Sequence, residues 1–190
     1  MRAPPAPTIE AVDPRLLAAP LDFLEAEHYR FRAFFAHLDR LRREKRAAPR
    51  AATARLLLDF LARDAALHLA EEETDLFPLL RIRCRAADGI ERVLALIEVE
   101  RARAHELAVA VVAGLRQCAR RCEPAAGFAD CAAAFAAALR RDVDWENALV
   151  LPLARKRLTA SDLARLSEAM AARRGVADAR GSRRDGYFGG

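Results

Sequence analysis

The sequence predicts an all-α protein, an antiparallel up-down-up-down four-helix bundle with a short C-terminal fifth helix. Three observations favour this fold class. Apolar residues recur at alternating spacings of three and four along several long segments, which is the pattern of helices that bury one face. Short clusters of proline, glycine and charged residues separate these segments, so consecutive helices are expected to run antiparallel. Alanine is abundant throughout and favours helix, and no alternating strand pattern competes.

The chain of 190 residues has the length of one ordinary domain, and we expect a bundle with extensions at both ends. Residues 1–19 are rich in proline and are predicted to form an extended arm. Residues 20–158 are predicted to form the four-helix bundle and residues 159–175 the short fifth helix. The Gly- and Arg-rich residues 176–190 are predicted to be a disordered tail.

The first helix is predicted to begin at Pro20 and to end in the charged stretch before Pro49. The second is expected from about Ala51, with Pro78 kinking it or ending its regular part. The predicted buried face of the first helix comprises Leu21, Leu24, His28, Phe31, Phe35 and Leu38. That of the second comprises Leu57, Leu61, Ala65, His68, Glu72, Leu76 and Leu79.

The third helix is predicted from about Ile90 to Cys122, between a turn at residues 87–89 and the break at residues 123–127. Thr159 or Ser161 is expected to cap the fifth helix, which should end near Gly175. The predicted buried face of the fourth helix comprises Phe128, Cys131, Phe135, Leu139, Asp142, Glu146, Leu149 and Leu153.

Charge and hydropathy exclude several classes of protein. The formal net charge is +5, but residues 173–190 carry five arginines and two aspartates and so account for +3 of it. Because a nucleic-acid-binding protein concentrates positive charge on its folded face, we expect no nucleic-acid partner. No apolar run approaches the length of a membrane span, and the first twenty residues lack a signal-peptide pattern. A cytoplasmic protein is therefore expected.

Two pairs of polar residues interrupt the apolar faces. His68 and Glu72 are four residues apart, as are Asp142 and Glu146, so each pair projects from one side of its helix. His28 lies in the same setting on the first helix. Burying a carboxylate without a partner costs about several kcal/mol, which is the penalty of an isolated buried ion. A bound cation would remove that penalty. Carboxylate and imidazole together suit iron, manganese or zinc.

A second interpretation needs no metal. A buried glutamate can instead pair with an arginine, and the chain contains thirty of them. Arg32 and Arg103 lie one turn beyond His28 and Val99, within reach of the predicted core carboxylates. At this point both interpretations stay open.

The two halves of the chain resemble each other. The stretch from Glu27 to Arg32 is similar to residues 98–103, and residues 68–78 are similar to residues 142–152. In both halves the second carboxylate, Glu72 or Glu146, lies six residues before a proline. Two helical hairpins packed face to face would bring the polar positions together at one central point.

These residues carry a resemblance to the hemerythrin-like (HHE cation-binding) domains. The resembling motifs are Glu27-His28, the stretch HLAEEETDLFP from His68, and WENALVLPLARKRL from Trp145. The resemblance covers about residues 20–158. It implies a four-helix bundle that binds non-haem iron, commonly as a pair of ions. It also implies oxygen binding or sensing, iron handling, or repair of iron–sulfur clusters.

Carried over to this sequence, the resemblance makes His28 and His68 ligands of the first metal and Glu72 and Glu146 bridging carboxylates. The second metal expects histidines where this chain has Val99 and Asp142. Valine cannot bind a metal, whereas aspartate can act as a hard oxygen ligand. The expected ligand set is therefore His28, His68, Glu72, Asp142 and Glu146, holding one iron ion or at most two. An oxygen carrier is not expected, because that activity needs two irons.

The remaining histidines and the cysteines are expected to lie off the site. His105 falls more than one turn from Val99 and off its face, and His37 lies beside the apolar face rather than in it. The four cysteines are expected to be reduced thiols.

The leading hypothesis is thus a metal-binding protein with a sensing or iron-handling role, whose partners are the metal ion and a small diatomic ligand. The alternative is a metal-free bundle that serves as an interaction or structural module. An enzyme with oxidase-like chemistry is not favoured, because nothing in the sequence indicates a substrate.

Overall fold

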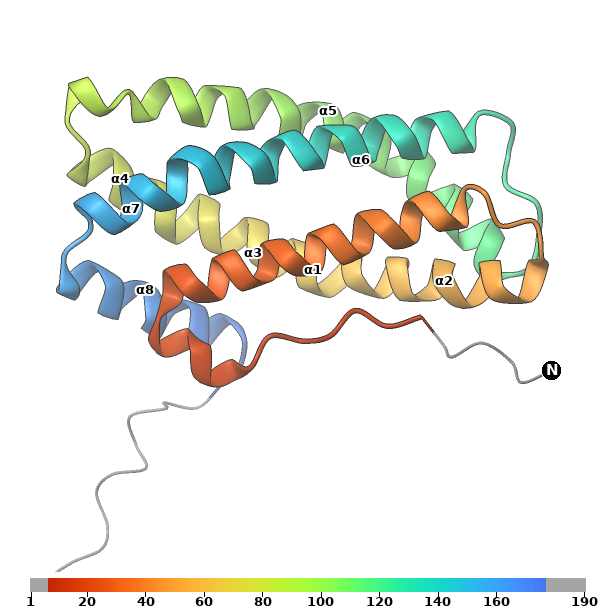
Figure 1. Ribbon diagram of the computed structural model, residues 1–190, viewed down its shortest axis with the longest axis horizontal. Coiled ribbons are helices and arrows are strands. Elements are labelled where there is room, and N and C mark those ends of the chain that lie inside the picture. Colours follow the sequence, from red (N-terminus) through yellow and green to blue (C-terminus); the bar gives the residue numbers. More distant parts are fainter. Residues whose placement is uncertain (1–6, 177–190) are drawn as a thin grey trace, which may run out of the picture.

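The computed structural model describes residues 7–176, and within this range it is an all-α bundle built from four long helical rods. The rods run alternately up and down (Figure 1), as the sequence predicts. The first rod is α1 (Pro20–Leu41) and the third is α5 (Ile90–Ala119). The second comprises α2 (Ala47–Asp59), η2 (Phe60–Ala65), α3 (Ala66–Glu71), η3 (Glu72–Leu76) and α4 (Phe77–Arg83). The fourth comprises α6 (Phe128–Trp145), η5 (Glu146–Val150) and α7 (Leu151–Arg157).

The rods form a closed ring around one core. α1 packs against α2 and α6, and α5 packs against the same two helices from the other side. The fifth helix, α8 (Ala160–Arg173), lies beside α1 at one end of the bundle together with the 3₁₀ turn η1 (Pro14–Ala18). Its N-terminus confirms one of the two expected caps, because Thr159 Oγ1 accepts a hydrogen bond from the Asp162 amide at 3.2 Å.

Helix ends differ from the predictions by a few residues. α2 begins at Ala47 rather than near Ala51, because a proline is tolerated in a first helical turn and Pro49 lies there. α5 ends at Ala119, and Arg121 adopts a left-handed conformation (φ 63°) that stops the helix before Cys122. A further 3₁₀ turn, η4 (Ala86–Asp88), occupies the predicted turn before α5.

The N-terminal residues from 7 onward run along the outside of α1 until η1 begins (Figure 1). The Arg30 guanidinium donates to the Glu10 carbonyl at 2.8 Å, and His37 Nε2 lies 3.0 Å from the Thr8 carbonyl oxygen. The extended arm predicted for residues 1–19 is therefore interrupted by a helical turn at Pro14. The tail predicted to be disordered falls outside the described residues except for Val176.

The predicted buried faces of the first and second rods point into the core: all six residues of the first are buried, and of the second only Leu61 is partly exposed. On the fourth rod Cys131, Leu149 and Leu153 are partly exposed, and beyond Glu146 the buried residues are Val150, Leu151 and Ala154, because η5 shifts the helical register.

The core is divided into two apolar clusters, one around Phe31, Phe60 and Phe135 and the other around Leu24, Leu80 and Leu94. A belt of buried polar residues lies between the two clusters. It holds all five ligands predicted from the sequence: His28, His68, Glu72, Asp142 and Glu146.

Three π-helical turns interrupt the described rods, η2 and η3 in the second rod and η5 in the fourth. Both η3 and η5 begin at the carboxylate found in the sequence repeat, Glu72 or Glu146, and end just before the helical turn that contains Pro78 or Pro152. Proline lacks an N–H and its ring collides with the carbonyl four residues earlier, so a wider turn preceding it relieves the collision. The predicted kink at Pro78 is thus a widened turn within a rod that continues to Arg83.

Candidate metal centre

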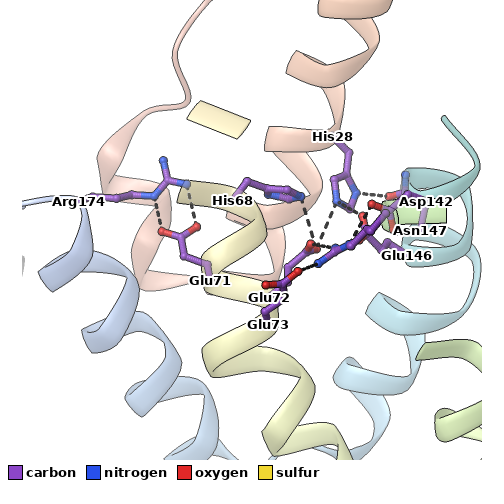
Figure 2. A network of polar contacts seen from close by, with 10 residues as sticks. His28, His68, Glu71, Glu72, Glu73, Asp142, Glu146, Asn147 and Arg174 are labelled. Carbon is purple, nitrogen blue, oxygen red and sulfur yellow. Dashed lines mark hydrogen bonds and ion pairs between the residues drawn. The ribbon is translucent and has the colours of Figure 1, made fainter. Parts of the chain in front are cut away.

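Four buried side chains from different parts of the chain converge in the polar belt (Figure 2). His28 comes from α1, His68 from α3, and Glu72 and Glu146 from the first residues of η3 and η5. One potential ligand atom from each residue lies within 4.8 Å of the others. All four side chains are no more than 1 % exposed, so water does not satisfy them from outside. Since a π turn adds one residue to its rod, η3 and η5 each fix the direction in which their first carboxylate points.

The converging atoms lack hydrogen-bond partners. His28 Nε2 lies 3.1 Å from Glu146 Oε2 and 3.8 Å from Glu72 Oε1, and His68 Nε2 lies 3.4 Å from Glu72 Oε1. None of these four atoms makes a contact with hydrogen-bonding geometry. Buried polar atoms are nearly always paired, and an unpaired one costs about 1–3 kcal/mol. Two imidazole nitrogens and two carboxylate oxygens in this arrangement fit a transition-metal cation, which would pair all of them at once.

Arg101 of α5 enters the belt from the opposite side. Its Nη2 donates to Glu72 Oε2 at 2.5 Å and to Glu146 Oε1 at 2.6 Å, while its Nε donates to Asp142 Oδ2 at 3.1 Å. A further hydrogen bond joins its Nη1 to Glu73 Oε1 at 3.1 Å. Each of the two central carboxylates is therefore divided, with one oxygen turned to the histidines and the other bound to the guanidinium.

Asp142 lies beside the four-residue cluster rather than within it. Its Oδ2 binds Arg101 and its Oδ1 has no hydrogen-bond partner. Burial and the neighbouring Glu146 charge raise the pKa of Asp142 to about 9, so that it carries a proton at neutral pH in the absence of a cation.

The same electrostatics separate the two histidines. Burial and the positive charge of His28 hold the pKa of His68 well below its usual range, which leaves this imidazole neutral and able to donate a lone pair. Burial also acts to lower the pKa of His28, but Glu146 and Glu72 overcome it and raise that pKa to about 10. Burial disfavours ionisation of Glu72, yet the charge of Arg101 and the contact with His28 together outweigh it and lower the pKa of Glu72. The metal-free centre thus holds a proton on His28, between carboxylates that a cation would otherwise engage.

Comparison with known families bears directly on this geometry. The model of the hemerythrin HHE cation-binding domain matches residues 19–154, which is most of the chain. The chain belongs to the hemerythrin HHE cation-binding domain family. No curated protein matches the sequence significantly. The matched range contains all four converging residues as well as Asp142 and Arg101.

Membership in the hemerythrin HHE family confirms the resemblance expected from the sequence, but one position in the repeat was misplaced. Val99, aligned with His28, is 65 % exposed on the outer side of α5. Arg101, two residues later, is the α5 residue that reaches the centre. The alignment of the two halves is therefore wrong on the third rod, and the prediction that Val99 stands at the metal site is wrong with it.

Sequence reasoning missed Arg101, although a signal for it exists. Ile97 and Ala104 are buried on α5, and Arg101 lies four residues after the first and three before the second. The same three-and-four spacing that identified His28 and His68 therefore includes this arginine. The two arginines named as partners for the core carboxylates, Arg32 and Arg103, are both exposed.

Supporting contacts hold the hemerythrin HHE centre from outside. The amide oxygen of Asn147 accepts from His28 Nδ1 at 2.9 Å, which leaves Nε2 facing the cluster. The edge of the His28 ring meets the His68 ring, with centroids 5.0 Å apart. Next to Glu72, the buried Glu71 carboxylate accepts two hydrogen bonds from Arg174 of α8, at 2.6 and 2.8 Å (Figure 2). Partners of this kind orient metal ligands and fix their tautomers.

The remaining candidates lie away from the centre. His105 is exposed on α5 and His37 is partly exposed on α1, as expected from the sequence. The cysteines of the described chain are all free thiols: Cys84, Cys118, Cys122 and Cys131. Among residues 7–176, no helix combines the length and apolar composition that a membrane crossing requires.

Proposed function

We propose that this hemerythrin HHE domain binds one transition-metal cation, non-haem iron, through His28, His68, Glu72 and Glu146. The observation that carries the proposal is the convergence of four buried, unpartnered ligand atoms within 4.8 Å. An unmade hydrogen bond costs about 1–3 kcal/mol for each buried atom, and in the metal-free chain the proton on His28, which lies between Glu146 and Glu72, offsets only part of this cost. A bound cation would pair with all four atoms, and removing this cost would contribute to the binding free energy.

The proposed stoichiometry is one ion per chain. Two carboxylates that bridge a pair of metals present one oxygen to each of them. In this chain Arg101 already binds the outer oxygen of both Glu72 and Glu146. Asp142, expected as a fifth ligand, is proposed instead to hold the guanidinium through its hydrogen bond with Nε. A second cation at this point would have to displace a positive charge that is buried among its partners.

The donor set supports iron as the metal. Two imidazoles with carboxylate on one side of a site, and other positions open, are typical of non-haem iron(II) proteins. Iron bound here would supply a change of oxidation state and an open position for a small diatomic ligand. The residues themselves would hold the ion, keep water out and fix the two carboxylates against Arg101. Manganese and zinc use the same donors and are the competing ions.

A sensing or iron-handling role is proposed rather than oxygen carriage, because reversible oxygen binding of the hemerythrin type needs a pair of irons. We place the protein in the cytoplasm, where four free thiols would stay reduced. We propose no nucleic-acid partner, because many of the arginines in the folded bundle are paired with carboxylates rather than gathered on one face.

Metal analysis tests this function. Protein purified without metal and reconstituted anaerobically with iron(II) should hold about one equivalent per chain after desalting. The variant His68→Ala should hold far less, whereas His105→Ala, which removes an exposed histidine of α5, should match the wild type. Competition among iron, manganese and zinc then identifies the preferred ion. Wild-type protein that retains well under one equivalent of all three would overturn the proposal.

The alternative function, a metal-free bundle that serves as an interaction or structural module, is favoured by one observation. Arg101 neutralises part of the buried negative charge without any metal. In that case His68→Ala should leave the folded state as stable as before, and chelator should not change the melting temperature. Both measurements separate the two functions.

A further inference from the structure

A cavity of about 680 Å³ lies between α3 and α5, next to the metal centre. α5 packs closely against α2 and also contacts α4, and the cavity opens between these two contacts. Its inner surface is formed by Phe31, Phe135 and Leu139, and its walls by Leu61, Leu69 and Val112. A volume of this size and an apolar lining are typical of sites for small organic molecules.

Small side chains keep the cavity open. Both sides contribute alanines where larger residues would meet across the gap, Ala65 and Ala66 from the second rod and Ala104 and Ala108 from α5. The cavity opens to solvent past exposed residues of its rim, Ala66, Ala102 and His105, so its apolar lining is in contact with water. An apolar occupant would remove this lining from water, which is favourable in proportion to the apolar area covered.

The charges at the inner end define the kind of occupant. Arg101 and Glu73 both line the cavity, and each is bound to the other at 3.1 Å. Its Nε and both Nη2 donors are committed to Asp142, Glu72 and Glu146, so its charge is balanced by carboxylates. No cation of the inner end is thus left to pair with an ionised head group. The exposed side chains His105 and Glu106 lie on the solvent side of α5.

Two lining residues also contact the metal centre. The Phe31 ring packs against the His68 ring with centroids 5.1 Å apart, and Arg101 binds both central carboxylates, Glu72 and Glu146. An occupant of the cavity would therefore press on the side chains that orient His68 and Glu72.

We propose that this cavity binds an uncharged, apolar organic molecule, and that its occupancy changes the properties of the metal centre through Phe31 and Arg101. The second half of this proposal rests on the proposed metal-binding function. The first half depends only on the fold, because the chain itself forms the cavity.

A matched pair of probes tests the binding half. N-phenyl-1-naphthylamine is uncharged, and 1-anilinonaphthalene-8-sulfonate has the same ring system with an added sulfonate. Fluorescence titration of the metal-free protein should show saturable binding of the uncharged probe and binding of the sulfonate at least about tenfold weaker. Equal binding of the two probes, or no binding of the uncharged one, would overturn the proposal.

A matched pair of variants tests whether the probe binds in this cavity. Ala108→Phe fills the cavity and should weaken binding of the uncharged probe by about tenfold or more. Ala110→Phe adds the same ring to the exposed side of the same helix and should leave binding unchanged. Equal effects of the two variants would contradict the assignment to this cavity.

Sedimentation of the wild type and both variants tests for another occupant. If the wild type is a dimer that Ala108→Phe dissociates, and the probe does not bind, a second copy of the chain covers the cavity and the proposal is overturned.

Cobalt(II), used in place of the proposed iron, tests whether occupancy of the cavity changes the metal centre. Saturating N-phenyl-1-naphthylamine should shift the visible absorption bands of the cobalt-loaded wild type and should leave those of Ala108→Phe unchanged. Probe binding without a band shift would overturn the coupling and leave the cavity assignment in place. A protein that binds the probe but takes up no cobalt or iron would refute the metal-binding function alone.

Discussion

The guanidinium of Arg101 supplies a fixed positive charge at the point where two buried carboxylates meet. Its Nη2 lies within 2.6 Å of an oxygen of both Glu72 and Glu146, and its side chain is 11 % exposed. Arginine suits this place because it stays protonated at all physiological pH values and presents several donors in one plane. One residue therefore supplies the fixed positive charge of the centre and, in the proposed function, limits the centre to one cation.

Replacing this arginine should open the second metal position. In Arg101→His the two outer carboxylate oxygens and Asp142 lose their cation, and an imidazole joins them. We expect metal content to rise from about one to about two equivalents per chain, measured by elemental analysis after reconstitution. Arg103→His, at an exposed position of the same helix, should remain at one equivalent. If Arg101→His also stayed at one, the guanidinium would not be what limits the stoichiometry.

A second buried ion pair, between Arg174 and Glu71, should contribute to the free energy of unfolding. Arg174 binds Glu71, which is fully buried, and lies 3.8 Å from the buried Glu27. In Arg174→Met both carboxylates lose this partner, and removing one member of a buried pair costs about 3–5 kcal/mol. Urea unfolding should show a loss of that order. Arg173→Met removes a more exposed pair with Asp75 and should cost about 1 kcal/mol or less; equal losses would contradict this.

The difference between what was predicted and what was missed is also clearest at single residues. His28, His68, Glu72 and Glu146 could be found because polar residues stand out within an otherwise apolar helical face. Arg101 could not be found in the same way, because an arginine on a long charged helix is normally expected at the surface. Its burial depends on carboxylates from two other rods, and only the assembled bundle brings those to α5.

At the scale of elements, the π turns η3 and η5 explain how two prolines affect the positions of the central carboxylates. Both begin at a central carboxylate and precede a proline, so the six-residue offset seen in the sequence has a structural cause. Pro78 correctly indicated a disturbance in the second rod, whereas the one beside Pro152 in the fourth rod was not predicted. Pro78 could not indicate a π turn rather than a kink, because the choice depends on how the rest of the rod packs.

Pro78→Ala should separate metal affinity from stability. Alanine restores an N–H and removes the ring, so that η3 can relax toward an α-helix and rotate Glu72 away from the histidines. We expect weaker metal binding in a chelator competition assay, with no loss of thermal stability in the metal-free protein. Pro49→Ala, in the first turn of α2, serves as the control and should leave metal affinity unchanged. A Pro78→Ala variant of wild-type affinity would show that η3 does not depend on this proline.

The cap of α8 should give the bundle an acid-sensitive contact. Hydrogen bonds from Arg83 and Thr159 hold the pKa of Asp162 well below its ordinary value of 3.8. A carboxyl whose pKa is lowered by folding stabilises the protein above its unfolded pKa and loses that contribution as the pH falls. Asp162→Asn should therefore melt at a lower temperature than the wild type at neutral pH. The difference between the two melting temperatures should become smaller below pH 3.8. Ser161→Ala should show no such trend, and a gap that is constant with pH would argue against the cap.

At the scale of the whole molecule, the polar belt divides the core into two apolar clusters. The alternating topology and the ring of four rods could be predicted, because helix spacing and short connections determine them. The cavity between α3 and α5 could not, because it depends on where two rods fail to meet and on alanines from both of them.

Metal removal should weaken the bundle as a unit. A ligand that binds only the folded state stabilises it by about 2.7 kcal/mol when its free concentration is a hundredfold above Kd. For a chain of this length that corresponds to about 5–10 °C in melting temperature. Calorimetry with and without chelator should show a drop of that size in the wild type and none in His68→Ala. An equal drop in both would attribute the effect to the chelator rather than to the centre.

The pairing of Arg101 with Glu72 and Glu146 has a consequence for how quickly the protein can exchange its metal. A chelator can extract a cation but not a covalently attached guanidinium, so the outer halves of both carboxylates stay in place when the ion leaves. Reloading then requires no refolding and no reassembly of the rods, only the loss of the proton held on His28. If the proposed function holds, a centre that empties and refills without refolding would follow changes in the surrounding metal supply many times within the life of one molecule.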